Sequence, residues 1–284
     1  MKKIQNSDPD KVFIILLFIG ISIMLYPIIS NYFYTSKYND ITDNYHKEVT
    51  RNNKNKILLK EATLYNNEIT EIKVLDIFKE NNNETSDKYN KILQITNDGM
   101  MGYIEIPKID IKLPIYHGTS ELVLNNGIGH LEGTSLPIGG KSTHSVLTGH
   151  RGMPSSKLFT DLNQLVIGDV FYIYILDNIL AYQVDKISII SPDDVSELKI
   201  IEGEDIVTLM TCTPYGVNTH RLLVRGKRVS YNIKSSKKVA KSHHISNSNF
   251  LFYVGFTIVA ALLTIKFILK KRLYIKKEIK YEEK

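Results

Sequence analysis

The sequence contains a single cysteine, Cys212, so the chain cannot form an internal disulfide. It has no cysteines and histidines at the spacing of a zinc site, and no cluster of carboxylates that would require calcium. No basic stripe interleaved with stacking aromatic residues runs through its central part, which argues against nucleic-acid binding. We therefore expect no metal and no cofactor. A lone cysteine in a secreted domain indicates either a reactive thiol or a link to another chain.

The composition is that of a folded protein. Charged residues make up 23% of the 284 positions and hydrophobic residues 43%, which excludes wholesale disorder. The net charge is +6, and much of this excess lies in the two tails, which favours contact with a membrane surface. We find no internal repeat.

Two apolar stretches lie near the ends of the chain. Residues 12–30 carry no charge over 19 positions and follow three lysines, and a helix of that length crosses about 30 Å of hydrocarbon. Residues 250–269 are interrupted only by Lys266, which can snorkel to the interface, and basic residues follow. Because basic flanks stay in the cytoplasm, we expect two spans, both termini inside and the intervening region outside. A cleaved signal peptide is the alternative for the first stretch, although no small-x-small cleavage site follows it.

These features predict a domain order along the chain. We expect a cytoplasmic tail (1–11), a transmembrane helix (12–33), an extracellular helical region (34–98), a β-domain (99–231), a linker (232–249), a second transmembrane helix (250–269) and a basic cytoplasmic tail (270–284).

The hydrophobic period changes near Gly102. Before it, apolar residues at i, i+4 spacing within residues 36–72 indicate amphipathic helices, with a solvated stalk as the alternative. After it, apolar and polar residues alternate between Ile104 and Leu113, as in strands. Many short strands separated by turn residues predict an all-β barrel or sandwich. Further strand candidates are residues 144–148, 169–176, 180–190, 205–211 and 221–229.

The cysteine lies where a strand is predicted to end. The apolar run 206–210 indicates a buried strand, and Pro214 with Gly216 breaks it, so the thiol of Cys212 falls at the start of a loop. Arg221 opens a second apolar run nine positions later. If the two strands are neighbours, both side chains can face one cleft. A nearby base or cation favours the thiolate, and a cation can stabilise an oxyanion.

Among the eight histidines, His150 is the best candidate for a catalytic partner, because it follows a short apolar strand and precedes a glycine. His220 adjoins Arg221, so strand alternation points its side chain to the opposite face. We expect the remaining histidines to be structural or to lie in the stalk and linker: His117, His130, His144, His46, His243 and His244.

Four longer strings carry a resemblance to a known family. They are GYIEIPKIDIKLPIYHG, GHLEGTSLPIGG, LTGHRG and TCTPYGVNTHRLLVRG, and the last follows TLM to give TLMTC at residues 208–212. With a histidine 62 positions upstream of the cysteine and an arginine nine positions downstream, residues 65–230 resemble a sortase, and specifically the class C, pilin-polymerising sortases. The resemblance implies a closed eight-stranded sortase-type β-barrel with N-terminal helices.

The resemblance also implies roles for the candidate residues. Cys212 is the expected nucleophile, His150 the acid/base or ion-pair partner, and Arg221 the group that holds the substrate carbonyl or the oxyanion. Thr211 either supports the oxyanion or is a plain strand residue. The implied reaction, on the outer face of a Gram-positive bacterium, cuts an LPxTG-like sorting signal and joins it to a lysine of the next pilin subunit. The alternatives are attachment to peptidoglycan, hydrolysis by a cysteine protease, and a non-enzymatic binding module.

A last feature is the triplet Asp76-Ile77-Phe78 within residues 74–80. Class C sortases carry an N-terminal lid with an Asp-Pro-aromatic triplet, in which the aspartate pairs with the catalytic arginine and the ring covers the thiol. Here Ile77 stands where the resemblance expects proline, so we expect a looser lid. The alternative is an ordinary helix end with a buried Phe78.

Overall fold

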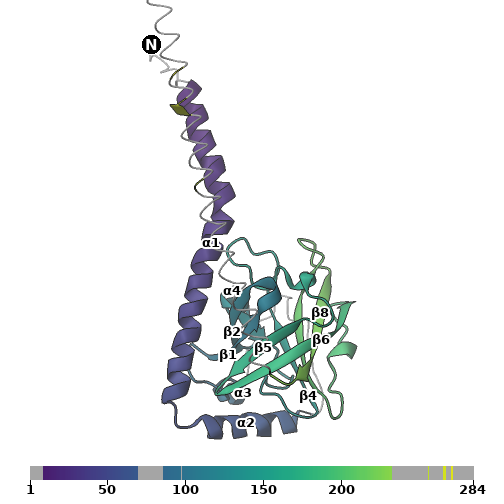
Figure 1. Ribbon diagram of the computed structural model, residues 1–284. Helices are drawn as coiled ribbons and strands as arrows, with labels where there is room; N and C mark the ends of the chain where they lie inside the picture. Colours follow the sequence, from purple (N-terminus) through teal and green to yellow (C-terminus); the bar gives the residue numbers. More distant parts are fainter. Residues whose placement is uncertain are drawn as a thin grey trace, which may run out of the picture. The chain divides into compact units, whose positions relative to one another are not determined.

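The computed structural model describes residues 9–69, 86–96 and 98–231, together with the isolated positions 255, 265, 266 and 270 (Figure 1). Asn31–Val239 forms one compact unit. The predicted lid (74–80), the predicted linker (232–249) and nearly all of the second predicted span (250–269) lie outside the described residues.

Four α-helices are described: α1 (Pro9–Arg51), α2 (Asn55–Glu68), α3 (Asp87–Lys91) and α4 (Glu121–Asn126). The first predicted span falls within α1, and the stretch Ile14–Arg51 is long and apolar enough to cross a membrane. Helix α1 continues past residue 33, the predicted end of the membrane span, to Arg51.

The part of α1 after Asn31 and helix α2 lie against the barrel (Figure 1). Tyr45, Val49 and Ala62 are buried, at the positions where the sequence shows i, i+4 spacing. The hydroxyl of Tyr45 donates to the carbonyl of Met101 at 2.9 Å and accepts from the amide of Leu176 at 2.9 Å. These residues therefore fix the helices to the domain, and this region is not a solvated stalk.

The predicted closed eight-stranded barrel is confirmed. Its strands pair in the order β1-β2-β3-β4-β7-β8-β6-β5 and close on themselves. The pairs β2/β3 and β4/β7 are parallel, and the other six pairs are antiparallel. The strands are β1 (Met100–Ile106), β2 (Ile111–His117), β3 (Ile128–His130), β4 (Thr143–Thr148), β5 (Val170–Ile175), β6 (Asn178–Ile190), β7 (Asp205–Thr213) and β8 (His220–Val229).

The alternating pattern of residues 104–113 does not form one continuous strand. A short 3-10 helix at Pro107–Ile109 separates β1 from β2, and Asp110 adopts the left-handed conformation with φ 54°. Pro107 cannot donate to a strand ladder because it lacks an N–H, so the chain turns there and β1 pairs antiparallel with β2. Strand β3 and helix α4 were not predicted, since three and six residues are too few for a clear periodic signal.

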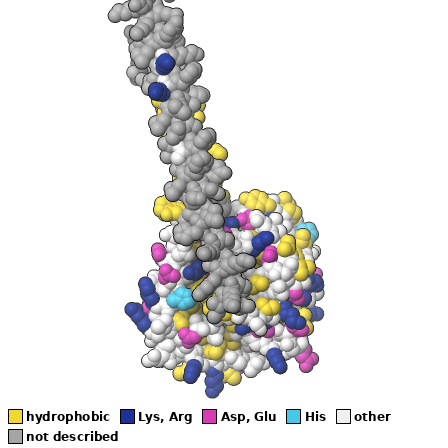
Figure 2. Space-filling view, in the orientation of Figure 1, with side chains coloured by type: hydrophobic (Ala, Val, Ile, Leu, Met, Phe, Trp, Pro, Cys, Tyr) yellow, Lys and Arg dark blue, Asp and Glu magenta, His cyan; other side chains and the backbone are white. Residues whose placement is uncertain are grey.

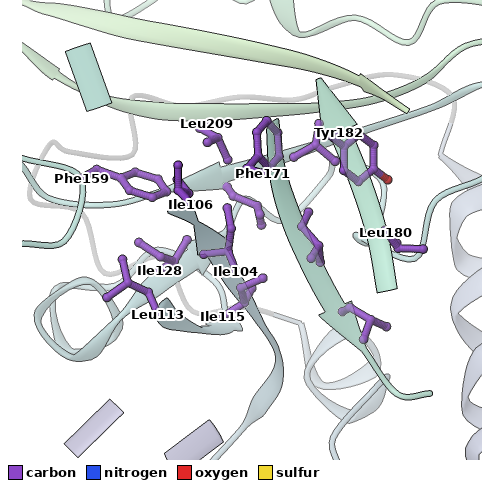
Figure 3. Close-up of a cluster of buried hydrophobic side chains, with 14 of the residues drawn as sticks. Ile104, Ile106, Leu113, Ile115, Ile128, Phe159, Phe171, Leu180, Tyr182 and Leu209 are labelled. Carbon is purple, nitrogen blue, oxygen red and sulfur yellow. The ribbon is translucent and has the colours of Figure 1, made fainter. Parts of the chain in front are cut away.

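The barrel interior is filled by side chains from every part of the sheet. Figure 3 shows Ile104, Ile115 and Phe171 among the residues that point into it. The packing is close enough to require glycine at position 226 of β8, where an added Cβ would lie 2.6 Å from the ring of Phe171. On the face seen in Figure 2, acidic and basic side chains are interspersed over the barrel domain.

Candidate active site

The register of β7 and β8 places Cys212 directly opposite Arg221. Side chains at directly opposed positions of an antiparallel pair lie on the same face, with Cβ atoms about 4.5–5.5 Å apart. Both residues are largely buried, with 7% of Cys212 and 5% of Arg221 exposed. His220, by contrast, is exposed, as alternation along β8 predicts.

The parallel pairing of β4 with β7 brings His150 alongside the cysteine. Thr148 is the partner of Met210, the last pair of this register, and His150 follows two residues after Thr148 as Cys212 follows two residues after Met210. The amide of Gly149 donates to the carbonyl of Met210 at 3.1 Å, which continues the pairing past the end of β4. The structure therefore pairs Cys212 with Arg221 and bonds Gly149, the residue before His150, to β7.

Bonds on both sides fix the His150 loop against β7. Before His150, the hydroxyl of Thr211 donates to the carbonyl of Gly149 at 2.7 Å. After it, Nη1 of Arg151 donates to the hydroxyl of Thr213 at 3.0 Å. The carbonyl of His150 itself accepts from the amide of Phe159 at 3.1 Å. His150 and Cys212 thus lie between two side-chain bonds that join the same pair of chain segments.

The guanidinium of Arg221 is oriented by the loop between β7 and β8. Its Nη1 donates to the carbonyls of Asn218 and His220, each at 3.1 Å. Because a guanidinium stays protonated at neutral pH, Arg221 cannot transfer a proton. It supplies a fixed positive charge beside the thiol, which suits stabilisation of a developing oxyanion.

The imidazole of His150 is partly sheltered, with 21% of its side chain exposed. Burial lowers the pKa of His150 below its ordinary value, and the carboxylate of Glu121 acts in the opposite direction. Oε1 of Glu121 lies 3.7 Å from Nε2 of His150. A thiol, a titratable imidazole and a fixed cation at one rim of the barrel can together perform acyl transfer through a thioester.

Thr211 lies on the opposite face of β7 from Cys212, because adjacent strand residues alternate. It is fully buried, and its hydroxyl is bonded to the carbonyl of Gly149. This contact gives Thr211 a role in holding the loop that carries His150.

Replacement of Thr211 by valine is expected to lower the free energy of unfolding by about 1–2 kcal/mol, because the buried carbonyl of Gly149 loses its donor. It should also change the pH dependence of Cys212 alkylation, which follows the thiolate fraction, because the His150 loop loses one of its bonds to β7. Thr208→Val is the matched control, since its hydroxyl on the same strand pairs with His144 at 2.7 Å. An unaltered alkylation profile in Thr211→Val would contradict this role.

The other histidines of the barrel are bonded within the fold. Nδ1 of His130 lies 2.7 Å from the hydroxyl of Tyr89, and burial lowers the pKa of His130 to about 3. His117 and His144 are also buried and contact backbone carbonyls. Among the residues that the structure describes, no group of three His, Cys, Asp or Glu side chains is placed to hold a metal ion.

Sequence reasoning missed two residues beside this site. Arg151 adjoins His150 in the chain, and its guanidinium lies 5.9 Å from the centre of the Tyr215 ring. Its place next to His150 in the string LTGHRG could have identified Arg151 as a residue of the site. Glu121 lies 29 positions before His150 in a short helix, so only the folded structure reveals their contact.

Comparison with known proteins points to one family. A model of the sortase domain matches residues 104–229. Sortase D of Bacillus subtilis (strain 168) is 31% identical over 132 residues, which is 45% of this chain and 64% of that protein. Sortase A of Bacillus anthracis is 30% identical over 137 residues, which is 48% of this chain and 62% of that protein. The chain thus spans less than two thirds of the length of these curated relatives.

Solved structures are more similar and are matched over nearly their whole length. Sortase C1 from Streptococcus agalactiae is 50% identical, with a TM-score of 0.62, over 68% of this chain and 100% of that chain. Sortase C-1 from Actinomyces oris is 47% identical, with a TM-score of 0.58, over 61% and 99% of the two chains. A pilus-related sortase C of Group B Streptococcus is 42% identical, with a TM-score of 0.63, over 67% and 97%.

Proposed function

Because the chain belongs to the sortase family, we propose that it is a membrane-anchored cysteine transpeptidase on the outer face of a Gram-positive bacterium. The observation that carries this proposal is the strand register that sets Cys212 opposite Arg221, with the His150 loop bonded along the same strand. The substrate is an LPxTG-like sorting signal, which is cut between its threonine and its glycine.

The first half of the reaction forms a thioester. The thiolate of Cys212 attacks the threonine carbonyl carbon, and the charge that develops on the carbonyl oxygen is stabilised by Arg221. The C–N bond to glycine then breaks, and the departing amine takes a proton from the imidazolium of His150. Splitting the transfer in this way replaces one difficult step with two easier ones.

The second half transfers the acyl group to an amine. A lysine of the next pilin subunit attacks the thioester and gives up a proton to His150, and Cys212 leaves as a thiolate. The product is an isopeptide bond between subunits. Because enzyme and substrates are tethered to one membrane, their effective concentration is high.

Two of the similar solved structures are of sortases linked to pili or pilins, which favours a pilin as the acceptor. One is described as a pilus-related sortase C, and the description of another, from Streptococcus pneumoniae, refers to pilin substrate specificity. The second apolar stretch (250–269) and the lid-like triplet also favour pilin assembly. Attachment to peptidoglycan and hydrolysis by water remain the alternatives, and they differ only in the group that receives the acyl chain.

An acceptor competition tests the proposal directly. The full-length chain in detergent micelles is incubated with an LPxTG-type peptide and two acceptors in equal amounts, a lysine-bearing pilin domain and a peptidoglycan stem peptide. The products are identified by mass spectrometry. The proposal predicts a pilin adduct that is heavier by the acyl group. Adducts on the stem peptide alone would support surface-protein attachment, and free acid alone would support a hydrolase.

The segment Asp76–Phe78 lies outside the described residues and remains a predicted lid. If its ring shields the thiol, Phe78→Ala should raise the rate of Cys212 alkylation by about tenfold, which corresponds to about 1.4 kcal/mol of lid closure. Ile77→Pro should slow alkylation, because proline stiffens the loop. Equal alkylation rates in Asp76→Ala, Phe78→Ala and the unmodified chain would rule out the lid.

A further inference from the structure

The carboxylate of Glu121 is held at the edge of the active site by its own helix. Ser120 caps α4, with its hydroxyl accepting from the amide of Val123 at 3.4 Å, and Glu121 is the first helical residue. One turn later, Nδ2 of Asn125 donates to Oε1 of Glu121 at 3.1 Å. The same oxygen lies 3.7 Å from Nε2 of His150. The amide of Asn125 therefore keeps this oxygen turned toward the imidazole.

The fold fixes α4 relative to β4, the strand that precedes the His150 loop. Leu124 on the inner face of α4 is 1% exposed, and an added Cβ on Gly129 of β3 would lie 3.1 Å from its side chain. Gly129 in turn pairs with Thr148, the last residue of β4. Helix α4 is thus packed on the strand next to β4, and the contact between Glu121 and His150 follows from this packing.

The charged and titratable groups around His150 come from four elements. Oε1 of Glu121 on α4 lies 3.7 Å from its Nε2, and Cys212 of β7 is paired with Arg221 of β8. Arg151, on the same loop as His150, directs its guanidinium to Thr213. Partial burial opposes protonation of the imidazole and lowers the pKa of His150, and the negative charge of Glu121 acts in the opposite direction.

We infer that Glu121 is a positioning residue, whose carboxylate turns Nε2 of His150 toward α4 and favours the protonated imidazole. The other ring nitrogen, Nδ1, is then directed away from α4 and exchanges the proton with the departing and attacking amines. This inference rests on the proposed function, in which a protonated His150 delivers the proton to the leaving amine. It adds an acidic residue to the cysteine, histidine and arginine of the site.

The primary test measures the protonation of His150 without any substrate. Full-length chains labelled with ¹³C and ¹⁵N at histidine are titrated by NMR in the Cys212→Ala background, which removes the coupling to the thiol. The His150 resonance is identified by its loss in His150→Gln. Glu121→Gln is expected to lower the pKa of His150 by about 0.2–0.7 pH unit, the size typical of an exposed ion pair. The shift should shrink in 1 M salt, because salt screens exposed charges.

Two further variants separate charge from structure. Glu121→Asp keeps the negative charge at the start of α4 but is one methylene shorter, so it should leave helix stability unchanged and lower the pKa of His150 by less than Glu121→Gln does. Glu61→Gln on α2 is the matched control for loss of one exposed carboxylate, and it should leave the pKa of His150 unchanged. In Figure 1, α2 lies at a different end of the domain from α4.

The change in the pKa of His150 should also alter the pH dependence of peptide cleavage. A step that needs protonated His150 is lost as pH rises through the pKa of His150, so a lowered pKa moves the alkaline limb of kcat/KM to lower pH in Glu121→Gln. The inference is overturned if the NMR-measured pKa is the same in Glu121→Gln and the parent chain, or if Glu61→Gln gives an equal shift. Because the titration uses no substrate, it tests the role of Glu121 separately from the proposed function. An unchanged pKa with successful ligation overturns only the role of Glu121, and a shifted pKa without ligation overturns only the proposed function.

Discussion

Replacement of Cys212 by alanine is expected to abolish both cleavage of the sorting signal and formation of pilin adducts. Without the thiol no thioester can form, and neither His150 nor the permanently charged Arg221 can replace it as the acyl carrier. Cys212→Ser should also lose activity, by about 10⁴-fold or more, because a hydroxyl is a far weaker nucleophile at neutral pH than a thiolate. Product formation is followed by mass spectrometry over a wide range of enzyme concentrations.

The control for this prediction is the stability of the fold. Cys212 is buried but lies at the end of β7, so its truncation to alanine should leave the barrel folded, as thermal unfolding can verify. Adducts that persist in a folded Cys212→Ala chain, at rates above those of the peptide alone, would show that another group carries the acyl chain.

Replacement of Arg221 by lysine is expected to lower kcat/KM by about 10²–10³-fold, the usual cost of losing one donor to a developing oxyanion. Lysine keeps the positive charge, but it lacks the planar fork that the carbonyls of Asn218 and His220 hold in place. A large loss in this variant therefore means that the geometry of the guanidinium matters as well as its charge. The measurement is peptide cleavage under conditions in which kcat and KM are resolved separately.

Arg225→Lys is the matched control for Arg221→Lys, because both residues lie on β8. Arg225 pairs with Asp185, with Nη2 2.7 Å from Oδ2, and its register partner on β7 is Thr208. Its conversion to lysine should change kcat/KM by less than about twofold, since surface ion pairs contribute little. Equal losses in the two variants would indicate a general effect on β8, and an unaffected Arg221→Lys would contradict the proposed role of the guanidinium.

The strands of the barrel could be predicted well because each of the longer ones carries its own local pattern. The predicted ranges 180–190 and 221–229 differ from β6 and β8 by no more than two residues at either end. The turn at Pro107–Ile109 was missed, although the alternation shifts by one residue between Ile106 and Ile109 and Pro107 lies in the gap. Strand β3 was missed because three residues carry no period and are defined only by their neighbours.

The residues of the candidate site also fall into those that local sequence features predict and those that only the fold reveals. Cys212, His150 and Arg221 were found from short strings and from their places at strand ends, which are local features of the sequence. The bond from Thr211 to Gly149 and the contact of Glu121 with His150 depend on the strand order β3-β4-β7. No spacing in the sequence reveals such contacts, because they join segments that are far apart in the chain.

The most direct test of the central claim is to observe the acyl intermediate on Cys212. The full-length chain is mixed with an LPxTG-type peptide without an amine acceptor, quenched in acid within seconds and analysed by intact mass and peptide mapping. The account predicts a mass increase equal to the peptide up to its threonine, located on Cys212 and removed by hydroxylamine. Cleavage of the peptide with no acyl group on Cys212, or with the acyl group on another residue, would contradict it.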